Sequence, residues 1–225
     1  MKAIVILLDS LNRHYLSTHG SDFAQTPNLD RLAGRSVVFD NHYLGSAPCM
    51  PARRDMLTGR LHFLERGWGG IEPFDITLPE MLREAGVHSH METDHYHYLA
   101  GGGEFYYSLF SSWACHRGQE NDNMPGSIAR IDEPEHLGKW AEQYDRNRAH
   151  FRTEADFPSP KTFAGAVDWL AANEDADNYL LWVEAFDPHE PFDCPDAYLE
   201  MYNDDWTGPR YDWSGYERVE EDSDA

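Results

Sequence analysis

Short apolar runs alternate along this chain with segments that carry helix-start signals. Strands are expected at residues 3–8, 36–43, 87–93 and 179–186. The runs at 3–8, 36–43 and 179–186 are rich in Ile, Val, Leu or aromatic residues, which is typical of strands, and the segment 87–93 directly follows a predicted helix that Gly86 ends. The first and the last run lack polar alternation, which predicts strands that are buried on both faces of a parallel sheet.

Residues that typically begin or end helices mark several further segments. Thr26 precedes Pro27 as a cap residue precedes the first helical position, and Gly86 is a typical residue to end a helix that begins at Thr77. Helices are expected at residues 26–32, 49–57, 77–85 and 162–172. Strands that alternate with helices predict an α/β fold, with a largely parallel or mixed sheet flanked by helices.

Polar residues directly follow three of the predicted strands. Asp9 ends the first strand, the segment Asp94–His97 follows the third, and the segment Asp187–His189 follows the last. In open α/β sheets, ligand-binding groups collect at the carboxyl ends of the strands. We therefore expect these three segments to lie together at one edge of the sheet.

The chain is expected to form one main part over residues 1–205. Within it, residues 116–160 are rich in Pro, Asn, Asp and Glu, which predicts an irregular excursion over the surface. Residues 206–225 are acidic and show no periodicity, which predicts a poorly ordered tail.

Composition and charge exclude several classes of function. Hydrophobic residues make up 41% of the 225 positions, which is enough for a sizeable core. The formal net charge is −22, from 40 acidic and 18 basic residues. Nucleic acids and anionic membranes are therefore not expected as partners, and an anionic substrate would need a local pocket of metal, Arg, His or helix amino termini.

Location and disulfide bonding can also be predicted. The amino-terminal apolar run stops at Asp9, which is too short for a membrane span, and no signal-peptide cleavage pattern follows. The cysteines at positions 49, 115 and 194 are odd in number and far apart, so they predict neither a disulfide framework nor a zinc site. The cytoplasm is the expected location.

The segment that most strongly suggests chemistry begins at Cys49. It reads Cys-Met-Pro-Ala-Arg over residues 49–53 and continues as Leu-Thr-Gly-Arg over residues 57–60. A cysteine at the start of a helix, beside Arg53 and Arg54, is expected in an electropositive setting that would also hold an anionic ester. The alternative is a buried structural cysteine.

The Cys49 segment resembles the signature of the sulfatase family, C-x-P-x-R followed by a Leu-Thr-Gly-Arg-like element. Residues 26–30, Thr-Pro-Asn-Leu-Asp, are similar to a structural stretch of the same family. The resemblance implies an alkaline-phosphatase-like fold, oxidation of Cys49 to formylglycine by a maturation enzyme, and hydrolysis of sulfate monoesters. It matches Asp9 to the first metal-binding aspartate of the family, and a helix cap is the alternative for this residue.

Two histidine segments resemble the family as well. Where Asp94–His97 follows its strand, the family often carries Gly-Lys-Trp-His, which aligns His97 with the histidine beside the formylglycine and His95 with the lysine. An imidazole is cationic only when its pKa is raised, so the sulfate-binding cation stays open, and two surface histidines are the alternative. The segment Asp187–Pro191 resembles the family's Asp-Pro-His-x-Pro, whose prolines would fix His189, and a loop that only ends a strand is the alternative.

The resemblance implies a role for each matched residue. A divalent metal would stabilise charge, and Ca²⁺ is expected because hard oxygen ligands suit it, with Mg²⁺ or Mn²⁺ as alternatives. The substrate would be a small-molecule or saccharide sulfate ester. The assigned residues are Cys49, Arg53, His97 and His189 for catalysis, His95 and His189 for substrate binding, and Asp9 and Cys49 for the metal.

The chain also departs from the family pattern. Ser10 stands where many members carry a second Asp, and the later Asp-Asn or Asp-His pair that completes the metal site does not follow Pro191. The resemblance runs from residue 3 to about residue 202 and matches only the first half of a typical member, so the fold is expected to be incomplete. Three alternatives stay open: a phosphonate or phosphate ester hydrolase of the same superfamily, a site completed by a second chain, and a non-catalytic fragment.

Overall fold

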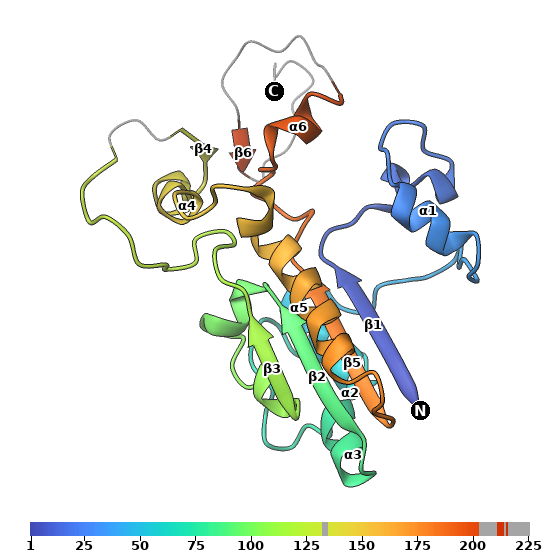
Figure 1. Cartoon of the computed structure of the whole chain (residues 1–225). Helices are drawn as coiled ribbons and strands as arrows, with labels where there is room; N and C mark the ends of the chain where they lie inside the picture. The colour runs from blue at the N-terminus through green and yellow to red at the C-terminus, as the bar shows by residue number, and fades with distance from the viewer. Residues whose placement is uncertain (132–134, 203–210, 214, 216–225) are drawn as a thin grey trace.

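A four-stranded parallel sheet forms the centre of the protein, seen in a computed structural model that describes residues 1–131, 135–202, 211–213 and 215 (Figure 1). The strands are ordered β1–β5–β2–β3. Their bounds are Lys2–Leu8 for β1, His88–Thr93 for β2, Ser112–Cys115 for β3 and Tyr179–Ala185 for β5. Leu8 pairs with Ala185 and Thr93 with Glu184, so three of the strands end at nearly the same level.

Helices cover both faces of this sheet. Helix α5, Pro158–Ala172, packs on one face against β5 and β2. Helices α2, Cys49–Thr58, and α3, Leu78–Glu84, lie on the other face (Figure 1). The start of α3 is fixed by a capping box, in which the amide of Thr77 donates to the Glu80 carboxylate at 3.2 Å.

The remaining elements lie outside these layers. They are α1, Pro27–Ala33; α4, Ala141–Arg148; α6, Asp196–Leu199; and the short strands β4, Leu137–Gly138, and β6, Tyr211–Trp213, which pair with each other. Turns of 3-10 helix span Arg13–Tyr15, Ser17–His19, Tyr96–Leu99, Tyr107–Leu109 and Glu154–Asp156. Within the described part of the chain, no helix combines the length and the apolar character needed to cross a membrane.

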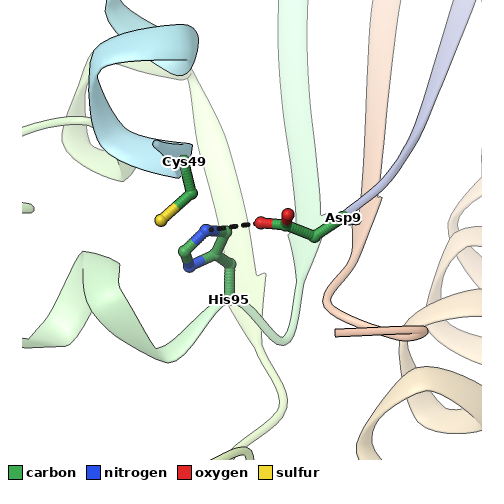
Figure 2. Close-up of side chains that lie close together, drawn as sticks. All are labelled: Asp9, Cys49 and His95. Carbon is green, nitrogen blue, oxygen red and sulfur yellow. Dashed lines mark ion pairs between the residues drawn. The ribbon is translucent and has the colours of Figure 1, made fainter. Parts of the chain in front are cut away.

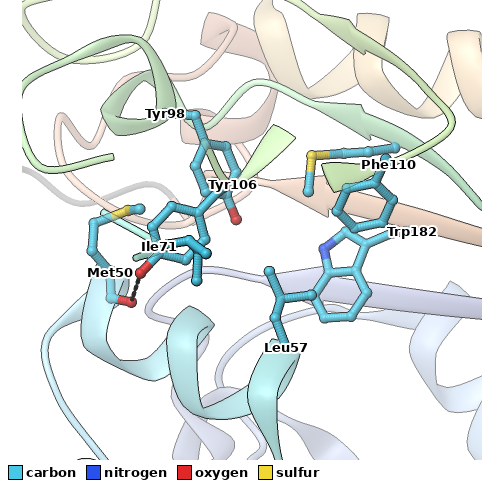
Figure 3. Packing of buried hydrophobic residues seen from close by; sticks show 8 residues of the cluster. Met50, Leu57, Ile71, Tyr98, Tyr106, Phe110 and Trp182 are labelled. Atoms are coloured by element: carbon cyan, nitrogen blue, oxygen red, sulfur yellow. Dashed lines mark hydrogen bonds between the residues drawn. The ribbon is translucent and has the colours of Figure 1, made fainter. Parts of the chain in front are cut away.

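Two apolar cores hold the sheet and helices together. The core on the α2 side is shown in Figure 3 and consists of Met50, Leu57, Ile71, Met91, Tyr98, Tyr106, Phe110 and Trp182. The hydroxyl of Tyr106 donates to the carbonyl of Met50 at 3.1 Å, which ties this core to the first turn of α2. On the other face, Ala166 of α5 packs against Leu181 and Val183 of β5. Because β5 contributes to both cores, it is buried on both faces, as its sequence predicts.

Most of the predicted elements are present and in the predicted order. The strands expected at residues 3–8, 87–93 and 179–186 are confirmed within one residue at each end, as are the helices expected at 26–32, 49–57 and 77–85. Helix α5 begins at Pro158 rather than at residue 162, because a proline is well tolerated in the first turn of a helix. Thr26 precedes α1 as expected, although its side chain makes no capping hydrogen bond.

Two strand predictions are wrong in whole or in part. Residues 36–43 form no strand, and Phe39 and Tyr43 within them are largely exposed. The sequence predicts that β1 is buried on both faces, but β1 is an edge strand and Ile4 and Ile6 are 51% and 52% exposed. An apolar run indicates that a strand tends to be buried. It does not show whether another strand or helix among the described residues packs against it.

Residues 116–160 differ from the predicted surface excursion. They contain β4 and α4, and Gln119, Glu120 and Asp122 are buried. Of the tail predicted at 206–225, residues 211–213 form β6 and bury Trp213, and apart from residue 215 the rest lies outside the described residues.

Glu92 is a charged residue buried on the α5 face of β2. Its carboxylate lies 3.0 Å from Nε2 of His90 and 2.8 Å from Nε2 of His116. Gly165 of α5 leaves room for this side chain, because a Cβ atom there would lie 2.6 Å from Oε2 of Glu92. Burial acts to raise the pKa of Glu92, but the two imidazoles act more strongly and lower the pKa to about 2.

Glu92 should therefore stabilise the fold in a pH-dependent way. Its pKa in the folded protein lies below the ordinary value of 4.5, so its contribution is complete above pH 4.5 and is lost as the pH falls toward about 2. We expect Glu92→Gln to lower the free energy of unfolding above pH 4.5, and the difference from the wild type to disappear near pH 2. Urea unfolding followed by circular dichroism measures this, and a difference that does not change with pH would contradict it.

Candidate active site

The carboxyl ends of β1, β2 and β5 meet at one edge of the sheet, as the sequence predicts. The amide of Asp9 donates to the carbonyl of Ala185 at 3.0 Å, and the amide of Asp94 donates to the carbonyl of Glu184 at 3.3 Å. The chain therefore leaves each of these strands at nearly the same level. The segments brought together are Asp9, Asp94–His97 and Asp187–His189.

Cys49 is the first residue of α2, with Pro48 as the cap residue before it. The position of the helix is fixed by Met50 and Leu57, which are completely buried in the core against the sheet. A hollow of about 390 Å³ lies at the start of this helix. It is lined by Asp9, Cys49, Arg53 and His189 of the predicted site, and by apolar residues that include Leu11, Leu44 and Met56.

Asp9, Cys49 and His95 converge at this edge, as Figure 2 shows. Each offers one atom of the kind that binds metals, and these atoms lie within 4.8 Å of one another. Nε2 of His95 lies 3.3 Å from Oδ2 of Asp9. The His95 ring is fully buried, and among the described residues neither of its nitrogens has a well-aligned hydrogen-bond partner. A buried imidazole in this state is costly unless another group, such as a cation, uses its lone pair.

Arg53 is the centre of charge in the site. Its Nη2 donates to Oδ2 of Asp9 and its Nε donates to Oε1 of Glu184, both at 2.9 Å. The other oxygen of Glu184 accepts from the hydroxyl of Tyr98 at 2.8 Å and from the indole of Trp182 at 3.0 Å. All three charged side chains are buried, so each charge depends on these partners rather than on water.

Burial and pairing oppose each other in these groups. Burial acts to raise the pKa of Asp9, but His95 and Arg53 lower that pKa by more, so Asp9 is a carboxylate. Burial acts to lower the pKa of Arg53, but Glu184 raises it further, and the guanidinium stays charged. Burial lowers the pKa of His95 in spite of the nearby acids, which favours a neutral ring.

The thiol of Cys49 is not activated in this setting. Burial and the negative charge of Asp9 raise its pKa to about 12, whereas the sequence predicts electropositive surroundings. The charge of Arg53 is taken up by its two carboxylates. Arg54 turns away from the site and donates to the carbonyls of Gly67 at 3.0 Å and Gly69 at 2.7 Å. An unmodified Cys49 is therefore a poor nucleophile.

The histidines at positions 97 and 189 lie on either side of Glu120. Nε2 of His97 lies 3.2 Å from Oε2 of Glu120, and Nδ1 of His189 lies 3.6 Å from Oε1 of the same residue. His189 lines the hollow, and its Nδ1 donates to the carbonyl of Glu190 at 2.8 Å. His97 is not among the residues that line the hollow, and its ring packs edge-on against Trp68 with centroids 5.0 Å apart.

The buried carboxylate of Asp94 connects the segments around the site by hydrogen bonds. Its Oδ1 accepts from the amide of Phe186 at 2.6 Å, and its Oδ2 accepts from the hydroxyl of Ser159 at 2.8 Å and the amide of Gln119 at 3.2 Å. Gln119 also donates to Asp187 at 3.2 Å. Burial and the nearby Asp187 raise the pKa of Asp94 to about 7. These bonds tie β2, β5, α5 and the segment after β3 to one another.

Sequence reasoning missed the residues that hold the candidate groups. Glu184, Glu120, Gln119 and Tyr98 are buried around the site and received no role. For Glu184 a signal was available, because a single acid inside an apolar strand needs a buried partner. Glu120 and Gln119 fall in a polar segment, where no periodicity separates buried positions from exposed ones.

The donors of Asp9, Cys49 and His95 fit part of a divalent-metal site. They supply a carboxylate, a sulfur atom and an imidazole. Oxidation of Cys49 would replace the sulfur with oxygen, which suits hard cations such as Ca²⁺ or Mg²⁺. Because Ca²⁺ takes about six to eight oxygen ligands, the remaining ones would come from water or from residues beyond those described.

The sequence model of the family described as Sulfatase matches residues 2–217. The chain belongs to the sulfatase family. Human N-acetylgalactosamine-6-sulfatase is 27% identical to this sulfatase-family chain over 168 residues, which is 64% of this chain and 31% of the human protein. The chain thus spans about a third of the length of that curated relative.

Solved structures confirm the predicted alkaline-phosphatase-like α/β fold. A protein solved in complex with its substrate D-glucosamine-2-N,6-O-disulfate has a TM-score of 0.62 and 20% identity. The match covers 89% of this chain and 37% of that protein. The phosphonate monoester hydrolase of Agrobacterium radiobacter has a TM-score of 0.61 and 17% identity, over 89% of this chain and 43% of that one. The conversion of Cys49, the metal and the role of each site residue stay predictions.

Loss of the charge on Glu184 should destabilise this sulfatase-family chain. Glu184→Gln leaves Arg53 with one carboxylate in a buried position, and breaking a buried ion pair costs about 3–5 kcal/mol. We expect the free energy of unfolding, measured in urea, to fall by about 3 kcal/mol. The control is Glu142→Gln, because water screens the exposed pair of Glu142 with Arg146. Equal losses in the two variants would contradict a buried charge centre at Arg53.

Proposed function

We propose that this chain carries the nucleophile-bearing part of an enzyme that hydrolyses sulfate monoesters, with Cys49 converted to formylglycine. The observation that carries the proposal is the convergence of Asp9, Cys49, Arg53 and His189 on one hollow at a helix amino terminus. Backbone amides at such a terminus attract anions, which suits a sulfate ester. The raised pKa of the Cys49 thiol supports the conversion, because the unmodified residue would be a weak nucleophile at neutral pH.

The residues around the hollow have chemically distinct roles in this proposal. Formylglycine, hydrated to a geminal diol, would supply one hydroxyl that attacks sulfur and a second that expels sulfate as the aldehyde re-forms. His189 gives a proton from Nε2 of its doubly protonated ring to the departing alcohol oxygen, because Nδ1 keeps its own proton in the bond to the Glu190 carbonyl. Arg53 steadies the diol, and His97 assists proton transfer at it.

His95 has two candidate roles. The family resemblance predicts a substrate-binding cation at this position. Its complete burial, its neutral ring and its contact with Asp9 instead support a metal ligand. A divalent metal held by Asp9, His95 and the converted Cys49, with Ca²⁺ as the expected ion, would act as a charge clamp on the sulfate group.

Hydrolysis of phosphonate or phosphate esters is the second candidate function. It is supported by the single Asp9 with Ser10 beside it, and by the structural likeness to a phosphonate monoester hydrolase. A helix amino terminus and a guanidinium would receive either tetrahedral anion. Comparison of kcat/KM for a matched aryl sulfate and aryl phosphonate separates the two functions.

We also propose that polypeptide beyond the described residues completes the site. The support is the apolar side chains that the described residues leave exposed, among them Ile4 and Ile6 on the edge strand β1 and Phe39 and Tyr43 before α2. Proteins normally cover an apolar edge strand. The cover would be a further segment or a second chain that also brings the remaining metal ligands, and without it the described residues would be a non-catalytic fragment.

Conversion of Cys49 is tested by the mass of the tryptic peptide Ser36–Arg53. Trypsin releases this peptide because it cleaves after Arg35 and after Arg53. We expect a mass that matches formylglycine in protein from the native host, or from co-expression with a formylglycine-generating enzyme. Cys49→Ala, prepared in the same way, is the control. An unmodified thiol under these conditions would remove the nucleophile assignment and make the non-catalytic alternative the leading one.

Metal binding is tested by calorimetric titration of the converted protein. We expect a dissociation constant for Ca²⁺ on the order of 10⁻³ M, because one carboxylate gives a weak site, and no binding heat from Asp9→Asn. Asp75→Asn is the control, since Asp75 is a carboxylate with a little-exposed side chain that pairs with Arg66 away from the hollow. If the unsubstituted protein binds none of Ca²⁺, Mg²⁺ and Mn²⁺ at millimolar concentration, these residues do not form a metal site by themselves.

A further inference from the structure

Glu120 lies between two histidines of the site and is itself almost completely buried. Only 3% of the residue is exposed. Its two carboxylate oxygens face different imidazoles, with Oε2 at 3.2 Å from Nε2 of His97 and Oε1 at 3.6 Å from Nδ1 of His189. His97 belongs to the turn after β2 and His189 to the turn after β5, so one side chain joins the segments that leave two strands.

The backbone around Glu120 is held in an unusual conformation. Glu120 has a φ of 47°, in the left-handed region, which costs on the order of 1 kcal/mol for a residue other than glycine. Its carbonyl accepts from the amide of Asn147, a completely buried side chain, at 3.1 Å. Next to it, Gln119 is bonded to Asp94 and Asp187 at 3.2 Å each. These bonds therefore fix the backbone at Glu120, from which its carboxylate reaches the two histidines.

The turn that carries Glu120 is anchored on its other side as well. The carboxylate of Asp122 accepts from the amide of Gly118 at 3.0 Å and from Nε of Arg117 at 2.9 Å. Residues from 117 to 122 thus form a closed and partly buried turn whose conformation does not depend on the two histidines. A carboxylate on a backbone held in this way can restrict the orientation of the imidazoles that contact it.

We propose that Glu120 is a positioning residue that restricts the orientation of His97, and with the Glu190 carbonyl that of His189, at the edge of the site. The inference rests on the proposed sulfate ester hydrolysis, in which these two histidines move protons. A carboxylate that accepts from an imidazole fixes both the ring orientation and the nitrogen that carries the proton. Oε2 of Glu120 lies beside Nε2 of His97, and Oε1 lies beside Nδ1 of His189, whose proton is donated to the Glu190 carbonyl. Glu120 therefore acts on the His97 ring by direct contact and on the His189 ring through its charge.

The chain offers a matched comparison for this residue. Glu92 is a buried glutamate that also lies between two histidines, at 3.0 Å from His90 and 2.8 Å from His116. It points toward α5 and is not among the residues that line the hollow. A role that is only structural predicts similar behaviour for Glu120 and Glu92. A positioning role predicts that the two differ in kcat.

The first experiment compares Glu120→Gln with Glu92→Gln in the converted full-length protein, using an aryl sulfate. An amide keeps the shape of the side chain, but its NH₂ end cannot accept from an imidazole. We expect Glu120→Gln to lower kcat about 10- to 100-fold, as loss of a group that orients a functional histidine does, with KM changed less than about threefold. Glu92→Gln should leave kcat unchanged within about twofold. Equal effects on kcat in the two variants overturn the inference.

A double-mutant comparison shows whether Glu120 acts through the histidines. In the His97→Ala and His189→Ala backgrounds, Glu120→Gln should cost a smaller factor in kcat than in the wild type, because one of the two oriented groups is already absent. Losses that multiply fully in both backgrounds show that Glu120 acts independently of the histidines, and they overturn the inference.

A third measurement does not depend on turnover. In ¹H–¹⁵N spectra of the imidazoles, Glu120→Gln should shift the ring-nitrogen resonances of His97 and His189 and leave those of His90 and His116 in place. Glu92→Gln should do the reverse. Unmoved resonances of His97 and His189 overturn the inference whatever the activity. Shifted resonances in a protein without sulfatase activity support the pairing and count against the proposed function instead.

Discussion

A guanidinium held between two buried carboxylates is the interaction on which the site depends. Arg53 lies one turn after Cys49 in α2, and it joins Asp9 at the end of β1 to Glu184 inside β5. Because a buried charge left without a partner costs several kcal/mol, any movement of the start of α2 away from the sheet is strongly opposed. The location of Cys49 over the strand ends therefore follows from electrostatics as much as from the apolar core beneath the helix.

The sequence predicts those parts of this arrangement that depend on local pattern. The apolar run of β5 and the residues that precede α2 and α3 set those elements to within one residue. The polar groups at the strand ends follow from them, because parallel strands in register bring Asp9, the residues after Thr93 and the residues after Ala185 to one level. The Cys49 segment then gives the family, which is a matter of resemblance rather than of physics.

Features that depend on distant neighbours could not be predicted in this way. The run of β1 is as apolar as that of β5, yet β1 lies at the edge of the sheet because no described strand pairs with its far side. Backbone strain could not be predicted from the sequence either. Ser10 and Glu120, beside the site, have φ values of 57° and 47°, although neither is a glycine. Such conformations persist only where the surroundings hold them, and for Glu120 that support comes from Asn147, 27 residues further along the chain.

The charged side chains around the site have partners within the described residues, whereas several apolar side chains remain exposed. Around the site, Arg53, Glu184 and Glu120 all have their partners within the described residues. The apolar surface is much less complete, since Ile6 on β1 and Phe39 near the hollow-lining Leu44 are more than half exposed. Completion of the site from beyond the described residues would therefore bury apolar surface, and it would also supply the metal ligands that the described residues lack. Burial of apolar surface in such a completion would contribute through the hydrophobic effect, and the ion pairs of Arg53 would already be in place before it.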